Sequence, residues 1–178
     1  MNRFLDKPLV LVGMMGCGKT TLGSALAREW GVKFFDVDAV IEQHFQKTVS
    51  EIFATEGEAF FRGAESEVIK ALLEHEQVVI ALGGGAFLSK RNRNIIKNKA
   101  LSVFLKVPSE ILFRRLEKKA AHRPLLQSGQ GNLRERIGVL LKEREPVYAL
   151  ADVTVSFDKR QSLKRAIEFF EEEIAGKI

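Results

Sequence analysis

The sequence predicts an α/β fold in which one five-stranded parallel sheet is covered by helices on both faces. Three observations support this. Five short apolar runs alternate with segments that have helical spacing, at residues 9–12, 33–35, 78–82, 101–105 and 153–156. Runs that are apolar throughout are typical of strands buried on both faces, as in parallel sheets. A glycine-rich segment joins the first run to the first helical segment. Ligands of such sheets bind at the carboxyl ends of the strands, so we expect the functional site there.

The glycine-rich segment at residues 13–20, GMMGCGKT, fits the pattern G-x-x-x-x-G-K-[ST]. A Cβ at its glycines would hinder the wrapping of backbone N–H groups around phosphates. The following helix, apolar at helical spacing up to Trp30, directs its unpaired N–H groups and positive dipole end at the same anion. Lys19 is placed to reach the β- and γ-phosphates, and the Thr20 hydroxyl can bind Mg²⁺. The segment predicts a nucleotide-binding loop; a chance glycine turn is the alternative.

Two acids follow the second predicted strand, in the sequence Asp36-Val37-Asp38. If the strand conformation persists, their side chains share a face. One carboxylate can then hold Mg²⁺ through water while the other accepts the proton of an attacking hydroxyl. Alternatively, Asp38 caps a helix expected at residues 39–45. We favour the catalytic interpretation because the pair lies at the ligand-binding edge.

Two further helices are expected before the third strand. Residues 48–51 form a capping box for a helix through Phe53. A longer helix is predicted at residues 58–73. Arg62, in its first turn, either pairs with Glu65 on the surface or grips a substrate carboxylate bidentately, and the sequence leaves both open. The residues expected on the inner side of this helix are Phe60, Ala64, Val68, Ala71 and Leu72.

The third predicted strand continues directly into Gly83-Gly84-Gly85. Three consecutive glycines weaken any regular element, and a tight turn rarely needs three of them. We therefore expect the backbone to approach a ligand closely at this loop, although a simple strand-to-helix turn is the alternative.

The segment at residues 120–131 interrupts the alternation of strands and helices. Before it we expect a helix at 89–98, capped by Ser89, and another at 108–119. The segment itself is polar and contains glycine and proline, which is typical of a mobile flap over an active site. Arg123 within it is either solvated or closes over the phosphates and offsets the charge of the transferring group.

The last third of the chain is predicted to hold two more helices around the fifth strand. Asn132 and Glu135 form the cap of the first. Arg144 in this helix lies between two glutamates and has the same two interpretations as Arg62. An amphipathic helix at 162–175 closes the chain.

Composition limits the class of protein. The chain has 178 residues, enough for one domain with a sizeable core, and its 46% hydrophobic and 29% charged residues are those of a soluble globular protein. Its net charge of +5 suits a small anionic substrate and a nucleoside triphosphate as well as nucleic acid. Aromatic and basic residues do not interleave as a stacking platform requires, so we expect no nucleic-acid partner.

The sequence also indicates a location. The single cysteine, Cys17, cannot form an internal disulfide, which fits a reducing cytosol. Residues 1–7 lack the apolar core of a signal peptide, and no stretch approaches the roughly 20 apolar residues of a membrane span. We expect a cytoplasmic monomer with no membrane partner.

Taken in order, the motifs resemble those of the shikimate kinases, small P-loop kinases of the nucleoside monophosphate kinase superfamily. The resemblance extends from Gly13 to about Arg160, and two positions depart from it: Leu82 stands where many members have threonine, and Cys17 where serine or alanine is frequent. The ordered set is specific, although each motif alone is weak. The matches are residues 13–20 with the Walker A loop, 36–38 with D-x-D, 61–65 with F-R-x-x-E, 83–85 with the triple-glycine loop and 123–126 with the lid R-P-L-L.

This resemblance implies the three-layer P-loop kinase fold as a single domain at residues 1–178, with strand order 2-3-1-4-5. It implies substrate-binding helices at about 39–73 and a mobile lid at about 120–131. It also implies ATP as co-substrate with Mg²⁺, and transfer of the γ-phosphoryl group to the 3-hydroxyl of shikimate in the route to chorismate.

Carried over by position, Asp38 would contact the ring hydroxyls and act as base, while Arg62 and Arg144 would hold the carboxylate. Lys19 and Arg123 would be catalytic with Asp38, and the lid arginine would reach ATP. Metal ligands would be Thr20 and, through water, Asp36. The full set of substrate-binding residues would be Asp38, Arg62, Gly83, Gly84, Gly85 and Arg144, with Gly84 touching the ring. The nucleotide-binding set would be Gly16, Cys17, Gly18, Lys19, Thr20, Thr21, Arg123 and, as a possible adenine contact, Gln161.

Two other functions compete with this interpretation. A related small-metabolite kinase such as gluconate kinase would also use a P-loop and a lid, but the triple glycine and F-R-x-x-E favour shikimate kinase. A nucleotide-dependent switch would hydrolyse ATP without an acceptor. A GTPase switch would carry N-K-x-D, and the sequence contains no such motif.

Overall fold

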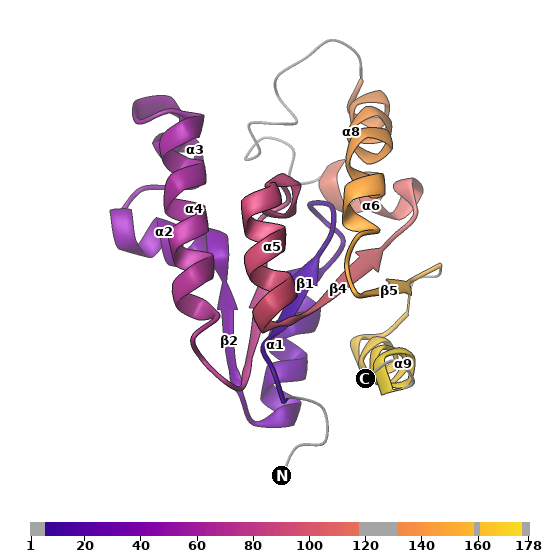
Figure 1. The fold of residues 1–178 in the computed structure, drawn as a ribbon. Helices are drawn as coiled ribbons and strands as arrows, with labels where there is room; N and C mark the ends of the chain where they lie inside the picture. Colours follow the sequence, from indigo (N-terminus) through magenta and orange to yellow (C-terminus); the bar gives the residue numbers. More distant parts are fainter. Residues whose placement is uncertain (1–5, 118–131, 159–160, 176–178) are drawn as a thin grey trace.

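A parallel sheet of five strands forms the centre of the protein (Figure 1). The computed structural model describes residues 6–117, 132–158 and 161–175. The strand order is β2-β3-β1-β4-β5, and neighbouring strands are parallel, which confirms the predicted fold class and order. The strands are β1 (Leu9–Val12), β2 (Lys33–Asp36), β3 (Val78–Ala81), β4 (Leu101–Lys106) and β5 (Val153–Ser156).

Helices cover both faces of this sheet and make a three-layer structure. Helices α1 and α9 pack together on one face, and α5 lies on the other with α4 beside it (Figure 1). Helices α6 and α8 pack against each other on the side to which the arrowheads of β1 and β4 point. The helices are α1 (Lys19–Trp30), α2 (Val37–Phe45), α3 (Val49–Thr55), α4 (Glu58–Leu72), the short 3₁₀ helix η1 (Ala86–Leu88), α5 (Lys90–Lys99), α6 (Ser109–Glu117), α8 (Leu133–Tyr148) and α9 (Leu163–Ala175).

The core lies on both faces of the central strands. All residues of β1 and β3 are buried, as expected for strands with helices on either side. Helix α1 approaches the sheet closely because Gly23 has no side chain: a Cβ there would lie 2.7 Å from the ring of Phe34. The indole N–H of Trp30 donates to Glu171 Oε1 at 2.6 Å and joins α1 to α9. The start of α1, which carries the nucleotide-binding motif, is therefore held on a rigid base.

The predicted caps of α3, α5 and α8 are confirmed, whereas α2 is capped by Asp36 and not by Asp38. Thr48 and Glu51 form a capping box at the start of α3, and Asn132 and Glu135 form another at the start of α8. The Ser89 side chain accepts from the N–H of Asn92 and caps α5. Each cap satisfies N–H groups that the first turn of a helix leaves without partners, which is why these short motifs locate helix starts reliably.

Two local predictions are wrong. Helix α2 begins at Val37 rather than Ala39, because the Asp36 carboxylate accepts from the N–H groups of the next turn and ends the strand. The sequence also predicts that Phe60 lies on the inner face of α4, but its side chain is 42% exposed. The buried residues of α4 are Phe61, Glu65, Ser66, Ile69 and Leu72, so that of the predicted inner face only Leu72 is buried.

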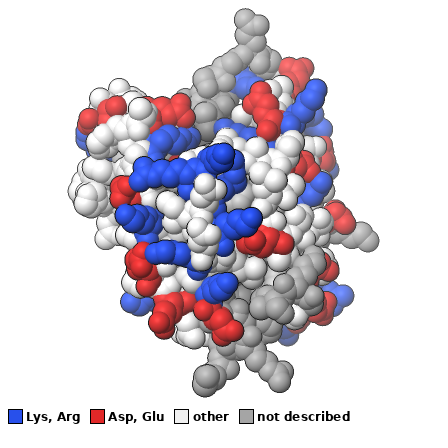
Figure 2. Space-filling model, viewed as in Figure 1, with Lys and Arg blue, Asp and Glu red and all other residues white. Residues whose placement is uncertain are grey.

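Basic side chains gather on the face where α5 lies, with acidic ones between them (Figure 2). Two of the acids come from α4 and the turn after it: Glu67 pairs with Arg91 at 2.9 Å, and Glu74 pairs with Lys99 at 2.5 Å. This surface therefore carries mixed charge. Within the described parts of the chain, no helix is both long and apolar enough to cross a membrane. The basic residues of α5 are Lys90, Arg91, Arg93, Lys97 and Lys99.

Candidate active site

The nucleotide-binding motif forms a tight loop between β1 and α1, as predicted. Gly13, Gly16 and Gly18 have φ of 145°, 81° and 106°, a region that favours glycine. A Cβ at Gly13 would lie 2.9 Å from the carbonyl oxygen of Leu105. Helix α1 begins at Lys19, so its first N–H groups and positive dipole end face the loop. The first turn of α1 contains no acid that would offset this positive end. The loop can therefore hold a phosphate with backbone groups alone.

Lys19 closes this loop from within. Its ammonium donates to the carbonyl oxygens of Gly13 at 2.8 Å and Met14 at 3.1 Å, and the side chain is buried. Cys17 is also buried, with its Sγ 3.8 Å from the Lys19 Nζ. Thr21, in contrast, is exposed. A positive charge is thus fixed where β- and γ-phosphates would lie.

Thr20 and Asp36, the two predicted metal ligands, lie side by side. The Thr20 hydroxyl donates to Asp36 Oδ2 at 2.6 Å. The other oxygen of the carboxylate, Oδ1, accepts from the backbone N–H of Asp38 at 3.1 Å and of Ala39 at 3.4 Å. The cap on α2 therefore fixes the orientation of Asp36 and turns one oxygen toward the nucleotide loop.

This pair of oxygens fits Mg²⁺, which prefers oxygen ligands and retains several waters and phosphate oxygens. Such a site needs only one or two ligands from the protein, and a hydroxyl with a carboxylate supplies them. Among the residues that the structure describes, no group of three or more His, Cys, Asp and Glu side chains forms a metal cluster.

The Asp38 side chain points to the triple-glycine loop, whereas Asp36 lies next to Thr20. A Cβ built on Gly83 would lie 2.5 Å from Asp38 Oδ1 and 3.0 Å from Glu65 Oε1. Two carboxylates from α2 and α4 therefore meet at the end of β3, in space that only a glycine leaves open. The sequence-based premise that Asp36 and Asp38 share a strand face is wrong, because the helix that starts between them directs each to a different task.

Arg62 is held by two acids of its own helix. It donates to Glu65 at 2.9 and 3.1 Å and to Glu58 at 3.3 Å. Its guanidinium carbon lies 5.3 Å from the ring centre of Phe61, within the range of a cation–π contact. A Cβ on Gly85 would approach Arg62 Nη2 to 2.6 Å. Arg62 thus does pair with Glu65, as one interpretation expected, but at the loop rather than on the open surface.

Burial and charge act in opposite directions on the pKa values of Arg62 and Glu65. Glu65 is 1% exposed, and burial raises the pKa of its carboxyl, opposed by the Arg62 charge and reinforced by Asp38. Burial alone would lower the pKa of Arg62, but the carboxylates of Glu65 and Glu58 together outweigh burial and raise that pKa. Arg62 therefore stays charged and is fixed in orientation.

Arg144 reaches the same loop from the opposite side. It is buried in α8 and donates to the carbonyl oxygen of Gly84 at 3.3 Å. Tyr148, one turn later, donates to the same oxygen at 2.5 Å. Gly84 also adjoins the nucleotide loop, since a Cβ on it would lie 3.5 Å from the backbone nitrogen of Met15. The triple glycine is therefore the meeting point of both arginines, Asp38 and the nucleotide loop.

A cavity of about 290 Å³ opens beside this meeting point. Both arginines line it together with the start of α5, and its size is near the lower end of small-molecule sites, about 300–1,000 Å³. Two guanidinium groups in one small cavity are suited to a carboxylate. The lining residues are Glu58, Arg62, Glu65, Ser66, Gly85, Leu88, Ser89, Asn92 and Arg144.

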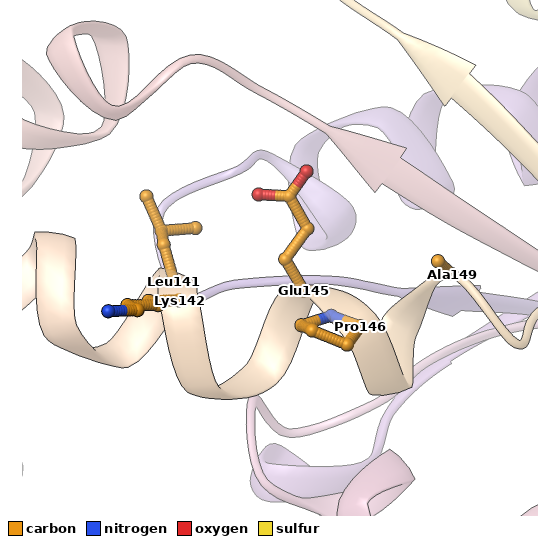
Figure 3. Close-up of a pocket in the computed structure, with 5 residues that line it drawn as sticks. All are labelled: Leu141, Lys142, Glu145, Pro146 and Ala149. Atoms are coloured by element: carbon orange, nitrogen blue, oxygen red, sulfur yellow. The ribbon is translucent and has the colours of Figure 1, made fainter.

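A second hollow, of about 360 Å³, lies on the surface of α8 (Figure 3). Its lining supplies one basic and one acidic side chain, and the acid, Glu145, forms an ion pair with Lys106. None of the predicted site residues lines it, so it is a groove of the helix surface. Its residues are Leu141, Lys142, Glu145, Pro146 and Ala149.

The outcome is different for two other predicted site residues. Arg123 and the expected lid at 120–131 lie outside the described residues. Gln161 is exposed just before α9. Conversely, the prediction included neither Tyr148 nor Glu65 as site residues. Glu65 belongs to the F-R-x-x-E match but was considered only as a partner of Arg62. No local pattern marks Tyr148, because it acts through a contact with a distant loop.

The nucleotide loop, the acids at the strand ends and the two arginines lie together in the fold, and comparisons with known proteins show the family of the chain. The shikimate kinase family model matches residues 15–175. The chain belongs to the shikimate kinase family. It is 48% identical over 151 residues to the shikimate kinase of Cereibacter sphaeroides, covering 85% of this chain and 74% of that protein. It is 43% identical to the shikimate kinase of Ruegeria pomeroyi, covering 92% and 83%.

Solved structures agree with this membership. A shikimate kinase from Acinetobacter baumannii in complex with shikimate superposes with a TM-score of 0.87 at 34% identity, over 97% of this chain and 95% of its own. A gluconokinase from Sinorhizobium meliloti reaches a TM-score of 0.56 at 17% identity, over 98% and 94%. That likeness shows the fold alone, so it lends no support to gluconate as acceptor. As a shikimate kinase, the protein is an ATP-dependent phosphotransferase that acts on an alcohol group.

Proposed function

We propose that this shikimate kinase transfers the γ-phosphoryl group of ATP to the 3-hydroxyl of shikimate at the triple-glycine loop. The observation that carries this proposal is the convergence of Asp38, Arg62 and Arg144 on Gly83–Gly85, beside the nucleotide loop. An anionic acceptor held there by its carboxylate would present a hydroxyl to Asp38 and to the phosphate donor together.

Asp38 is proposed as the general base. The acceptor hydroxyl loses its proton to the Asp38 carboxylate as its oxygen forms the new bond to the γ-phosphorus. The bond between that phosphorus and the β–γ bridging oxygen breaks, and ADP leaves with the electron pair.

Arg62 and Arg144 are proposed to hold the acceptor carboxylate. The ion pairs of Arg62 with Glu58 and Glu65 fix its guanidinium in advance, so less rotamer entropy is lost on binding. Arg144 is fixed from the other side by Gly84. Such fixed groups raise the rate mainly by orienting the acceptor hydroxyl.

Lys19 is proposed to hold the β- and γ-phosphates with the backbone N–H groups of Gly16, Cys17 and Gly18, and Thr20 and Asp36 to serve Mg²⁺. Bound Mg²⁺ would neutralise charge on the phosphate oxygens. Lys19 already lies inside the loop, so only short movements from the Gly13 and Met14 carbonyls are needed.

The remaining proposals extend beyond the described residues. We propose that the chain is a single cytoplasmic domain and a monomer, with Arg123 in a lid at about 120–131 that reaches ATP. The helices at about 39–73 would form the acceptor side. Lid closure would exclude water from the γ-phosphate and thereby limit ATP hydrolysis.

An ADP-release assay with ATP and Mg²⁺ tests the function directly. The acceptors compared are none, shikimate, gluconate and nucleoside monophosphates, and product mass is measured. Turnover with shikimate alone and the mass gain of one phosphoryl group are expected. Turnover with another acceptor would overturn the pocket assignment, and ATP loss without acceptor would favour a nucleotide switch.

Asp38→Asn tests the base. This change should reduce kcat by about 10² to 10⁴, the usual contribution of general-base catalysis, while ATP binding is unchanged. Glu67→Gln is the matched control, because it removes an acid from the exposed side of α4 that pairs with Arg91. Wild-type turnover by the Asp38→Asn variant would exclude Asp38 as base.

A further inference from the structure

Tyr148 makes a contact that the proposed mechanism does not use. Its side chain is fully buried at the end of α8, and its hydroxyl donates to the carbonyl oxygen of Gly84 at 2.5 Å, across 64 residues of sequence. The ring packs against Phe104 of β4 with a centroid distance of 5.4 Å. A buried phenol needs a hydrogen-bond partner, and this one finds it in the acceptor loop.

The same carbonyl oxygen is shared with a residue proposed to bind substrate. Arg144 lies one helical turn before Tyr148 and donates to Gly84 at 3.3 Å, a longer and weaker bond. A carbonyl oxygen has two lone pairs and can accept both. Because Tyr148 donates the shorter hydrogen bond to this carbonyl oxygen, the oxygen attracts the Arg144 guanidinium less strongly.

Gly84 also couples the two halves of the site. A Cβ on it would lie 3.5 Å from the nitrogen of Met15 in the nucleotide loop and 3.7 Å from Arg144 Nη1. A shift of Gly84 would therefore change the position of Arg144, and of a carboxylate bound to it, relative to the nucleotide loop. The phenol is rigid, with two side-chain torsions and a packed ring, so it can fix the glycine within a few tenths of an ångström.

We propose that Tyr148 is a positioning residue for the phosphoryl acceptor: by binding the Gly84 carbonyl it fixes the middle of the triple-glycine loop and leaves the Arg144 guanidinium to the acceptor's carboxylate. This rests on the proposed function, in which Arg144 binds that carboxylate.

Tyr148→Phe removes only the hydroxyl and keeps the packing against Phe104. The Gly84 carbonyl then has Arg144 as its donor, and the guanidinium is drawn toward the loop. The KM for shikimate should rise about five- to tenfold, the size expected for one hydrogen bond, with smaller changes in kcat and in the KM for ATP. An unchanged KM for shikimate would overturn the proposal.

Phe170→Leu is the control for a general loss of stability. Phe170 is fully buried in α9, on the face of the sheet away from α4 and α5. This variant should unfold at a lower urea concentration and keep the wild-type KM for shikimate. If it raised that KM as much as Tyr148→Phe does, the effect at Tyr148 would be structural, and the proposal would be wrong.

The Arg144→Ala background separates positioning from packing. Arg144→Ala alone should raise the KM for shikimate, and adding Tyr148→Phe should raise it little further, because the residue through which Tyr148 acts is gone. An equal increase in both backgrounds would overturn the proposal. If the wild type phosphorylates another carboxylic acid and not shikimate, the proposed function fails, and the same variants are compared on that acid.

Discussion

A methyl group placed at Gly83 provides a sharp test of how the acceptor loop works. Gly83 is buried at the end of β3, and a Cβ on it would lie 2.5 Å from Asp38 Oδ1 and 3.0 Å from Glu65 Oε1. Its φ lies outside the left-handed region, so alanine introduces no backbone strain there. The Gly83→Ala substitution therefore acts through the methyl contact with the two carboxylates.

The distances set the size of the effect. An ordinary contact begins at 3.4 Å, so the Asp38 carboxylate must retreat by about 0.9 Å. Because the obstructing atom ends a side chain, the retreat should cost only about 1 kcal/mol of stability, the low end of overpacking costs. A misplacement of about 1 Å in a catalytic group can cost roughly 10²-fold in rate. Gly83→Ala should thus lower kcat by about that factor with little unfolding.

Two other glycines provide comparisons. A Cβ on Gly85 would lie 2.6 Å from Arg62 Nη2. Gly85→Ala should therefore displace the group proposed to bind the acceptor carboxylate, and raise the KM for shikimate more than it lowers kcat. A Cβ on Gly138 meets nothing within 4 Å, and this residue is exposed in α8. Gly138→Ala should keep full activity and gain about 0.5–1 kcal/mol of stability.

ADP release at varied shikimate gives kcat and KM, and urea unfolding gives the free energy of unfolding for the same preparations. The expected pattern is a kcat defect at Gly83, a KM defect at Gly85 and neither at Gly138. A folded Gly83→Ala variant with wild-type kcat would refute the reasoning, because Asp38 could then move away from Gly83 without loss.

Three further predictions concern charge, capping and metal. Burial raises the pKa of Glu65 above its unfolded value, so its contribution to stability is full below about pH 4.3 and is lost as the pH rises through the folded pKa. Glu65→Gln resembles the protonated form, so the wild type should lose stability relative to this variant as the pH rises from acidic to neutral. If the two proteins differed in free energy of unfolding by the same amount at every pH in urea unfolding, this expectation would be contradicted. Asn132→Ala removes the cap of α8 and should cost about 1 kcal/mol in the same measurement, and no loss would show that the capping box is not formed in solution. Chelation of Mg²⁺ should abolish turnover and added Mg²⁺ restore it, with Thr20→Val requiring more; an unchanged Mg²⁺ requirement would exclude Thr20 as a ligand.

Most of the fold could be predicted from local sequence. Buried strands, helix caps and the nucleotide loop each depend on residues close together in the chain, so their signals survive without tertiary information. The loop at residues 13–20 and the capping boxes at Thr48 and Asn132 are found where the sequence placed them. The strand order followed from the resemblance to a family, since periodicity alone does not order strands.

The site could be predicted only in part. Asp36, Asp38, Arg62 and Arg144 were identified as candidates, and the structure gathers them near the triple glycine and the nucleotide loop. The division of roles between Asp36 and Asp38 was implied only by the resemblance to a family. The residues by themselves left it open, because it depends on where the strand ends and the helix begins. Arg123 lies outside the described residues, so its predicted role stays a hypothesis.

The sequence by itself determined which segments are strands and helices, which loop is the candidate for phosphate binding and which charged residues are candidates for the site. Only the tertiary structure decided that α4 turns Phe61 and Glu65 inward, with Phe60 exposed. It also decided that Tyr148 binds Gly84 across 64 residues. The physical reason is that helical periodicity specifies an apolar stripe, whereas the face that is buried depends on which neighbours pack against it and on which buried polar groups find partners there.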